Sequence, residues 1–227
     1  MSGRSRPVRT DPPADAAANR PPSWRRADEG EPPPALVEIA DGRLLLVPWR
    51  DEDAAEVVAF AADPELARFS SVGLVGSPEQ ARDWIRSRRA VGRLDWAVRD
   101  ASTGGLIGRV GLMNLHVADH EAEIGYATAA KSRGRGVATQ AVAVVSRYAF
   151  QTLGRHRLQI RHEPSNLASC AVAVKAGFRV EGVLRDAHAN GSGFEDLEVH
   201  GRLATDPEPG RAAGSPAAPS TAGWTST

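Results

Sequence analysis

A glycine-rich turn lies in the middle of the chain, between a strand-like run and a helix-like run. Residues 132–139 (SRGRGVAT) form the turn, and residues 122–128 precede it as the strand. The first four N–H groups of a helix have no partner within the helix, and the helix dipole adds about half a positive charge there. Gly134 and Gly136 carry no Cβ, so an anion can approach the main chain closely. The pattern predicts a strand–turn–helix unit that binds an anion, with pyrophosphate as the first hypothesis.

Two common phosphate-binding motifs are absent from the sequence. A Walker loop requires Gly-x-x-x-x-Gly-Lys-Ser/Thr, and the only lysines, Lys131 and Lys175, lie in no such string. The dinucleotide fingerprint requires a third glycine where this chain has Thr139. Arg133 and Arg135 add cationic side chains beside the turn. A solvated arginine- and glycine-rich loop without a ligand is the alternative that the turn alone leaves open.

The distribution of proline divides the chain. Of the 16 prolines, eight lie within residues 1–34 and four within residues 206–227. Both stretches are rich in Pro, Ala, Ser and Gly, and such segments bury too little apolar surface to offset the conformational entropy of the chain. We expect disordered tails at 1–34 and 206–227. Residues 35–205 have the size of one ordinary domain.

Charge and cysteine content narrow the function classes. The 28 basic residues balance the 28 acidic ones, so no net field favours nucleic acid. A single cysteine, Cys170, excludes an internal disulfide and a cysteine-based metal cluster, and no metal is expected. Residues 1–24 contain no apolar signal segment, and no apolar run approaches the ~20 residues that span a bilayer. These features predict a soluble cytoplasmic protein.

Hydrophobic periodicity predicts an α/β domain with a mixed sheet. We expect strands at residues 43–50, 94–99, 106–115, 121–129, 157–161, 178–187 and 194–203. We expect helices that begin at Asp51, at Ser77, after Gly136 and at residues 164–166. The predicted buried helix positions are Ala81, Trp84, Ile85, Val137, Ala141, Val144, Val145, Tyr148 and Ala149. About seven strands and four helices result.

Four short motifs lie in register over about sixty residues. They are RxxGxA at 133–138, NxxS at 166–169 followed by GF at 177–178, EIGY at 123–126 and EGxxRD at 181–186. Together they resemble the GCN5-related N-acetyltransferases (GNAT), over roughly residues 40–204. They are similar to its RimJ/RimL branch, which acetylates the N-terminal amine of ribosomal proteins. The resemblance implies a mostly antiparallel sheet whose central strands splay apart.

The resemblance also implies which residues hold acetyl-CoA. The pyrophosphate would be bound by the backbone amides of Arg133, Gly134, Arg135, Gly136, Val137 and Ala138. The pantetheine arm would bond to Ala127, Thr128 and Ala129, as an added strand does. One of these N–H groups would stabilise the tetrahedral oxyanion. Asn166 would contact pantetheine, or it would act as a helix N-cap, and the sequence leaves both roles open.

Three residues are candidates for proton transfer. By the resemblance, Glu123 would be the base, directly or through a water; otherwise it is an outward-facing strand acid. Ser169 would protonate the departing thiolate, or it is an idle helical serine. His188 would be a base near the acceptor, or a surface loop residue. The tyrosine that many relatives place four residues before Gly-Phe is replaced by Ala173.

The sequence thus predicts an acetyl-CoA-dependent N-acetyltransferase, with direct attack by a primary amine. The favoured acceptor is the N-terminal α-amine of a protein. The alternatives are an acetyltransferase of a small amine (an amino sugar, a polyamine or an amino-acid-like compound) and a non-catalytic acyl-CoA-binding module. The expected partners are acetyl-CoA and the amine acceptor. We expect no membrane or specific nucleic acid partner, and a monomer or homodimer.

Overall fold

The computed structural model describes residues 36–90, 92–115, 120–190 and 193–209. Apart from residues 206–209, the tails expected at 1–34 and 206–227 lie outside the described residues. The strands are β1 (Ile39–Asp41), β2 (Leu44–Pro48), β3 (Leu94–Asp100), β4 (Leu106–Met113), β5 (Glu121–Thr128), β6 (Arg157–His162), β7 (Arg179–Asn190) and β8 (Gly193–Leu203). The α-helices are α1 (Ala54–Ala61), α2 (Pro64–Phe69), α3 (Pro78–Ser87), α4 (Val137–Gln151) and α5 (Leu167–Lys175). Short 3₁₀ turns are η2 (Asp51–Asp53), η3 (Ser71–Leu74) and η4 (Ala130–Ser132).

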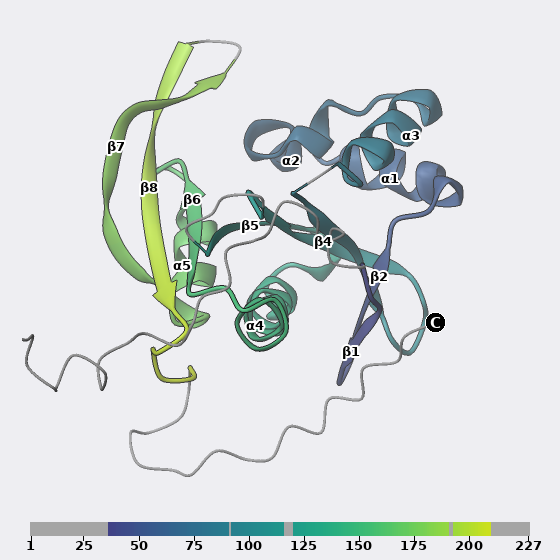
Figure 1. Ribbon diagram of the computed structural model, residues 1–227. Coiled ribbons are helices and arrows are strands. Elements are labelled where there is room, and N and C mark those ends of the chain that lie inside the picture. The colour runs from purple at the N-terminus through teal and green to yellow at the C-terminus, as the bar shows by residue number, and fades with distance from the viewer. Residues whose placement is uncertain (1–35, 91, 116–119, 191–192, 210–227) are drawn as a thin grey trace, which may run out of the picture. The chain divides into compact units, whose positions relative to one another are not determined.

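One eight-stranded sheet runs through the described part of the chain, in the order β1-β2-β3-β4-β5-β6-β8-β7 (Figure 1). Every neighbouring pair is antiparallel except β5 and β6, which are parallel. That parallel pairing covers only three residue pairs and ends at Glu123 opposite Gln159. Beyond this point the two strands separate. The mostly antiparallel sheet with splayed central strands is confirmed.

Helices cover both faces of the sheet and create two cores. On one face, α4 packs against the sheet (Figure 1), and Ile124, Leu158 and Ile160 belong to the core on this side. On the other face, α1 to α3 cover the sheet (Figure 1), and Trp49 and Trp84 belong to the second core. The helix positions predicted to face inward are all buried. In the described part of the chain, no helix is long and apolar enough to cross a membrane.

Two N-terminal details differ from the sequence prediction. The strand expected at 43–50 is the second arm of a hairpin, because Gly42 takes a positive φ of 58° and β1 pairs with β2. The Asp-Gly pair at 41–42 is a hairpin signal that could have revealed β1. The helix expected from Asp51 starts as the turn η2, and α1 begins only at Ala54. The capping carboxylate is that of Asp53, which accepts the Arg50 N–H at 2.8 Å.

The C-terminal hairpin is longer than predicted. The sequence predicted strands that end at 187 and resume at 194, whereas β7 continues to Asn190 and β8 begins at Gly193. His188 therefore lies in a strand, opposite Glu195, and not in a loop.

The predicted start of α3 is confirmed. Ser77 caps the helix, since its Oγ accepts the Gln80 N–H at 3.3 Å.

Candidate active site

The glycine turn has the backbone that anion binding requires. Gly134 and Gly136 take φ values of 71° and 75°, in the left-handed region that favours glycine. Gly136 is the N-cap of α4, and the first helical bond runs from the Gln140 N–H to the Gly136 carbonyl at 3.0 Å. The amides of residues 137–139 precede that bond and have no helical acceptor. The first turn of α4 contains no acidic side chain, so the helix dipole is not neutralised there.

Arg43 and Gln140 hold the turn from outside. The Arg43 guanidinium donates to the Arg135 carbonyl, and its Nε donates to the Gln140 side-chain oxygen at 3.2 Å. The Gln140 amide nitrogen in turn donates to the Asp41 carbonyl at 2.9 Å. Because the carbonyl of Arg135 is bonded, the turn is fixed by the β1–β2 hairpin before any ligand binds.

Arg133 is engaged within the protein. Its guanidinium forms ion pairs with Asp63 and Glu65 at the start of α2. The backbone N–H of Arg133 donates to the Ala130 carbonyl at 3.2 Å. The sequence assigned both the backbone and the cationic side chain of Arg133 to the anion site. In the structure the guanidinium fastens the turn to the start of α2, and the backbone N–H closes the turn η4.

Backbone groups of β5 point alternately to its two neighbouring strands. The Ala129 N–H donates to the Ile107 carbonyl at 3.0 Å, so Ala129 and, by alternation, Ala127 face β4. Tyr126 and Thr128 consequently direct their backbone groups towards β6, into the splay. Of the three residues expected to bond pantetheine, Thr128 alone faces that gap.

Glu123 stands at the last paired position before the splay. It lies opposite Met113 on β4 and Gln159 on β6. Its half-buried carboxylate forms an ion pair with Arg161 of β6. Side chains alternate along β5, and Ala127 on the same face packs into the core with α1 and α3. Glu123 therefore faces the side of the sheet that these helices cover.

Ser169 lies on the opposite face and is bonded to a tyrosine. Its Oγ is 2.8 Å from the Tyr126 hydroxyl, which also donates to the Ser169 carbonyl at 3.1 Å. Burial raises the pKa of Tyr126 to about 12, so the phenol keeps its proton at physiological pH. The Asn166 Oδ1 accepts the Ser169 N–H at 3.0 Å and caps α5. The N-cap role of Asn166 is confirmed. Because Oδ1 is engaged in the cap, a ligand contact by this side chain would use its nitrogen.

The remaining catalytic candidate, His188, is exposed on β7 opposite Glu195. Its neighbours in the hairpin are also exposed. The structure thus brings Glu123 and Ser169 to the two faces of one splay, and places His188 on the long C-terminal hairpin.

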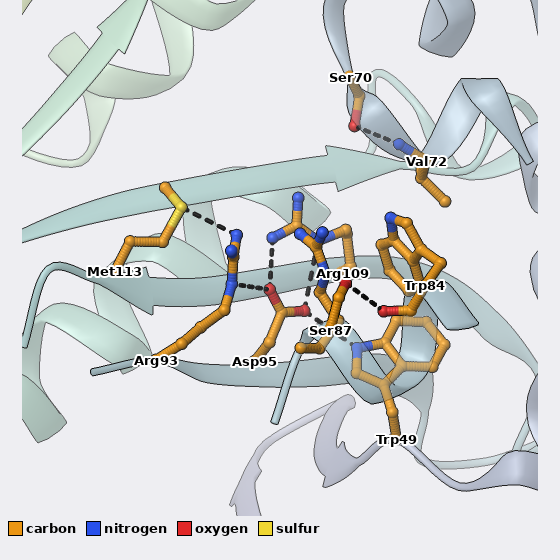
Figure 2. A network of polar contacts seen from close by, with 10 residues as sticks. Trp49, Ser70, Val72, Trp84, Ser87, Arg93, Asp95, Arg109 and Met113 are labelled. Carbon is orange, nitrogen blue, oxygen red and sulfur yellow. Dashed lines mark hydrogen bonds and ion pairs between the residues drawn. The ribbon is translucent and has the colours of Figure 1, made fainter. Parts of the chain in front are cut away.

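A buried polar network lies on the Glu123 face (Figure 2). The Asp95 carboxylate accepts from Trp49 Nε1 at 3.0 Å and from Arg109 Nη2 at 2.6 Å. Arg93 lies 3.6 Å from the same carboxylate and contacts the sulfur of Met113, the residue opposite Glu123. One buried acid therefore faces several guanidinium groups, and this part of the sheet has an excess of positive charge.

Arg88 extends this positive region. Its guanidinium lies 4.7 Å from the centre of the Trp84 ring. Burial, together with the neighbouring Arg93 and Arg109, lowers the pKa of Arg88 to about 10. Burial is the larger cause of this lowered pKa, and the like charges of Arg93 and Arg109 add to it.

A pocket of about 330 Å³ lies beside the glycine turn, between α1 and the end of β5. It is lined by Glu56, Ala59, Phe60, Asp63, Gly105, Leu106, Ala129, Ala130 and Lys131. Its two acids already have partners, because Glu56 pairs with Arg99 at 2.7 Å and Asp63 pairs with Arg133. The pocket is separate from the splay.

Tyr126 is the residue at this site that the sequence showed only as the last letter of the EIGY motif, with no role of its own. Ala173 stands where many relatives carry a tyrosine, and Ala173 is fully buried. The structure supplies a phenol from β5 instead. Alternation puts Tyr126 on the same face as Ile124 without settling which face that is, and nothing in the sequence indicated Ser169 as its partner.

Comparison with known proteins agrees with this architecture. The family model described as the acetyltransferase (GNAT) domain matches residues 43–179. The uncharacterized N-acetyltransferase YoaA of Bacillus subtilis is 30% identical over 158 residues, which are 67% of this chain and 89% of that protein. The ribosomal-protein-serine acetyltransferase of Escherichia coli is 28% identical over 98 residues, 43% of this chain and 55% of that protein.

Among solved structures, Mycobacterium smegmatis RimJ in complex with CoA-disulfide superposes with a TM-score of 0.65. It is 24% identical, and the alignment covers 74% of this chain and 86% of that one. A splayed sheet beside a glycine turn, in a chain with these relatives, defines an N-acetyltransferase. The chain belongs to the GNAT acetyltransferase family. Its relatives include a ribosomal-protein-serine acetyltransferase, in agreement with the RimJ/RimL-type branch that the motifs predicted.

Proposed function

We propose that the chain transfers acetyl from acetyl-CoA to the α-amine at the N-terminus of a protein. One observation carries this proposal: Glu123 and the Ser169–Tyr126 pair lie on opposite faces of the sheet, at the edges of the β5–β6 splay. A thioester in that gap would have a proton acceptor on one side and a proton donor on the other. Amine attack needs a proton acceptor within reach of the nitrogen, and thiolate departure needs a proton donor within reach of the sulfur.

The donor fits the residues around the splay. The amides of Gly134 to Ala138 would bind the pyrophosphate at the positive end of α4. The pantetheine arm would add to β5 as a strand, bonding the backbone of Thr128 and Tyr126. One of those N–H groups would stabilise the oxyanion, where an aligned donor contributes about 3 kcal/mol. The Asn166 side-chain nitrogen would contact the arm from α5.

The reaction then proceeds by direct transfer. A neutral amine attacks the thioester carbon, and its proton passes to Glu123, directly or through one water. The C–S bond breaks as the tetrahedral intermediate collapses, and the thiolate takes the Ser169 hydroxyl proton. The Tyr126 hydroxyl stabilises the resulting alkoxide by a hydrogen bond until it regains a proton from solvent, to which Glu123 releases the proton taken from the amine. Glu123 must exchange its Arg161 partner for the amine or water during this step.

The charge near Glu123 supports an α-amine over a polyamine. Four guanidinium groups, those of Arg88, Arg93, Arg109 and Arg161, accompany the two carboxylates of Asp95 and Glu123. Positive surroundings disfavour a polycation and favour the neutral form of an incoming amine. An α-amine has a pKa of about 8, against about 10.4 for lysine, so it is the easier amine to deprotonate.

The donor assignment is tested by Ala138→Glu, with Ala138→Gln as the matched control. Ala138 lies in the first turn of α4, where a carboxylate stabilises a helix. The same carboxylate would repel the pyrophosphate. We expect the glutamate variant to keep its Tm and to lose acetyl-CoA binding by at least roughly 30-fold in calorimetry, about 2 kcal/mol. Unchanged affinity would remove the loop as the donor site.

The acceptor is tested by incubating the chain with acetyl-CoA, peptides of varied N-terminal sequence, and small amines. We expect mass spectrometry to find acetylation at peptide α-amines, with little at lysine or spermidine. Preferred acetylation of a polyamine or an amino sugar would replace this acceptor. Binding of acetyl-CoA with no release of free CoA in the presence of any of these amines would support the non-catalytic alternative.

A further inference from the structure

Four potential metal ligands meet where α5 packs beside the C-terminal strands. They are His162 at the end of β6, Cys170 in α5, and Glu198 and His200 of β8. One ligand atom from each lies within 4.8 Å of the other three. His162 pairs with Glu198 across the β6–β8 ladder, and His200 follows two residues later on the same face. The sheet register therefore aims three of the side chains at the same point.

The two imidazoles and the carboxylate are in direct contact. The Nε2 atoms of His162 and His200 are 3.0 Å apart, and His200 Nε2 is 2.8 Å from Glu198 Oε1. His162 Nε2 lies 3.6 Å from the same oxygen. His200 is fully buried and His162 is 6% exposed. Water is largely excluded from this contact.

Between the two imidazoles and the carboxylate, one proton faces two acceptors, and the Cys170 thiol, which is hydrogen-bonded to Glu198, is the other donor of the cluster. His162 Nδ1 lies 2.8 Å from the Glu163 carbonyl, which can only accept, so the proton of the neutral ring is on Nδ1. The lone pair of His162 Nε2 then points at His200. A neutral His200 offers one Nε2 proton to both His162 and Glu198. Its Nδ1 is buried without a hydrogen-bond partner among the described residues.

We propose that His162, Cys170, Glu198 and His200 form a structural zinc site that clamps α5 to β6 and β8. Imidazole, thiolate and carboxylate are the ligands that zinc prefers, and four protein ligands are typical of structural sites. The charges balance, because thiolate and carboxylate neutralise Zn²⁺ and both imidazoles are neutral. The bond from His162 Nδ1–H to the Glu163 carbonyl orients that ring, as outer-shell partners of zinc-bound histidines do.

Binding requires defined proton movements and a small closure. The Cys170 thiol releases its proton to solvent, and His200 moves its proton from Nε2 to Nδ1. Bond lengths of about 2.0–2.3 Å set tetrahedral ligand separations of roughly 3.3–3.8 Å. The widest separation of 4.8 Å must therefore shorten by about 1 Å, and the contacts of 2.8 and 3.0 Å must lengthen by about 0.3–0.5 Å, through side-chain rotation. The alternative to zinc at this site is a proton on His162 Nε2, which would make His162 an imidazolium ion paired with Glu198.

Cobalt(II) distinguishes the metal from the proton, because Cys170 is the only cysteine in the chain. The untagged full-length chain is stripped with a chelator and titrated with Co²⁺. We expect one equivalent to produce the visible bands of tetrahedral cobalt and a near-ultraviolet thiolate charge-transfer band. Cys170→Ser should lose the near-ultraviolet band. A wild-type chain without saturable bands, or a serine variant that keeps the thiolate band, would overturn the proposal.

Zinc itself is tested by thermal unfolding and competition with a chromophoric chelator. At a thousandfold excess of zinc over Kd, we expect Tm to rise by roughly 10 °C. His162→Gln should weaken zinc binding by at least roughly 100-fold, whereas His188→Ala, an exposed histidine outside the site, should keep one equivalent. Circular dichroism verifies that each variant folds; if His162→Gln does not, Cys170→Ser decides. No rise in Tm and no zinc bound would exclude the site.

Discussion

The Tyr126 hydroxyl lies 2.8 Å from the Ser169 Oγ and joins β5 to α5 across the point where β5 and β6 separate. No backbone bond connects the two strands in the described register beyond Glu123 and Gln159. This side-chain bond therefore sets the position of the α5 N-terminus relative to β5. The pair can serve both the geometry and the proton transfer that we propose.

If Tyr126 acts through Ser169, their effects on catalysis should not add. Ser169→Ala should lower kcat by about 100-fold, the ordinary contribution of a general acid, and Tyr126→Phe by about 10-fold. The double variant should be no slower than Ser169→Ala, because the phenol has nothing left to stabilise. Steady-state kinetics of the four proteins measures the coupling. If the kcat losses of the two single variants multiply in the double variant, Tyr126 acts independently of the proton transfer from Ser169.

The pKa of Tyr126 predicts a loss of stability at alkaline pH. Burial raises this pKa to about 12 in the folded chain, against about 10 when unfolded. The folded state keeps the proton that the unfolded state releases, so the contribution is complete below pH 10 and is lost as the pH rises to about 12. The wild type should lose roughly 2–3 kcal/mol more than Tyr126→Phe over this range. Urea unfolding at several pH values measures the difference, and parallel curves would contradict it.

Glu123→Gln should lower kcat by about 100-fold at pH 7. The loss should be smaller at pH 9, because an α-amine of pKa about 8 is then mostly neutral, and Glu123 is needed only for the proton that the nitrogen loses on attack and no longer to deprotonate the ammonium form beforehand. Glu121→Gln is the matched control, since Glu121 is a β5 acid on the same face, paired with Arg157 at 3.2 Å. A loss that is equal at both pH values, or shared by the Glu121 variant, would rule against a base role.

Gly111→Ala should destabilise the chain through Asp95. A Cβ at Gly111 would lie 2.5 Å from Asp95 Oδ2 and 3.0 Å from the Leu94 carbonyl. Asp95 cannot move without losing its bonds to Trp49 and Arg109. We expect a cost of roughly 1–3 kcal/mol, or about 3–10 °C in Tm.

Gly105→Ala is the control for this substitution, because its nearest atom, Thr103 Oγ1, lies at an ordinary 3.5 Å. Its Tm should stay close to that of the wild type. Equal Tm values for the two alanine variants would show that the Asp95 network tolerates a methyl group.

The sequence was sufficient wherever local chemistry decides the structure. Positive φ at Gly134 and Gly136, the Ser77 cap and the buried face of α4 follow from interactions within a few residues. Period and turn residues therefore predicted the glycine turn and the order of the strands along the chain, and the four motifs carried the resemblance to the family. The strand β1 is an exception and was missed, because its three residues are too few to show the alternation by which a strand is recognised.

Tertiary structure decided the partners of each functional group. Only folding pairs Arg133 with Asp63, commits the Ala129 amide to β4 and joins Tyr126 to Ser169. The cluster around His200 is the clearest case, because its members come from β6, α5 and β8, and no local spacing links them. Local propensities and motifs depend on short segments of the chain, so the sequence by itself determined which chemical groups this protein has. Sheet register and helix docking, which depend on contacts between distant segments, decided which of those groups meet.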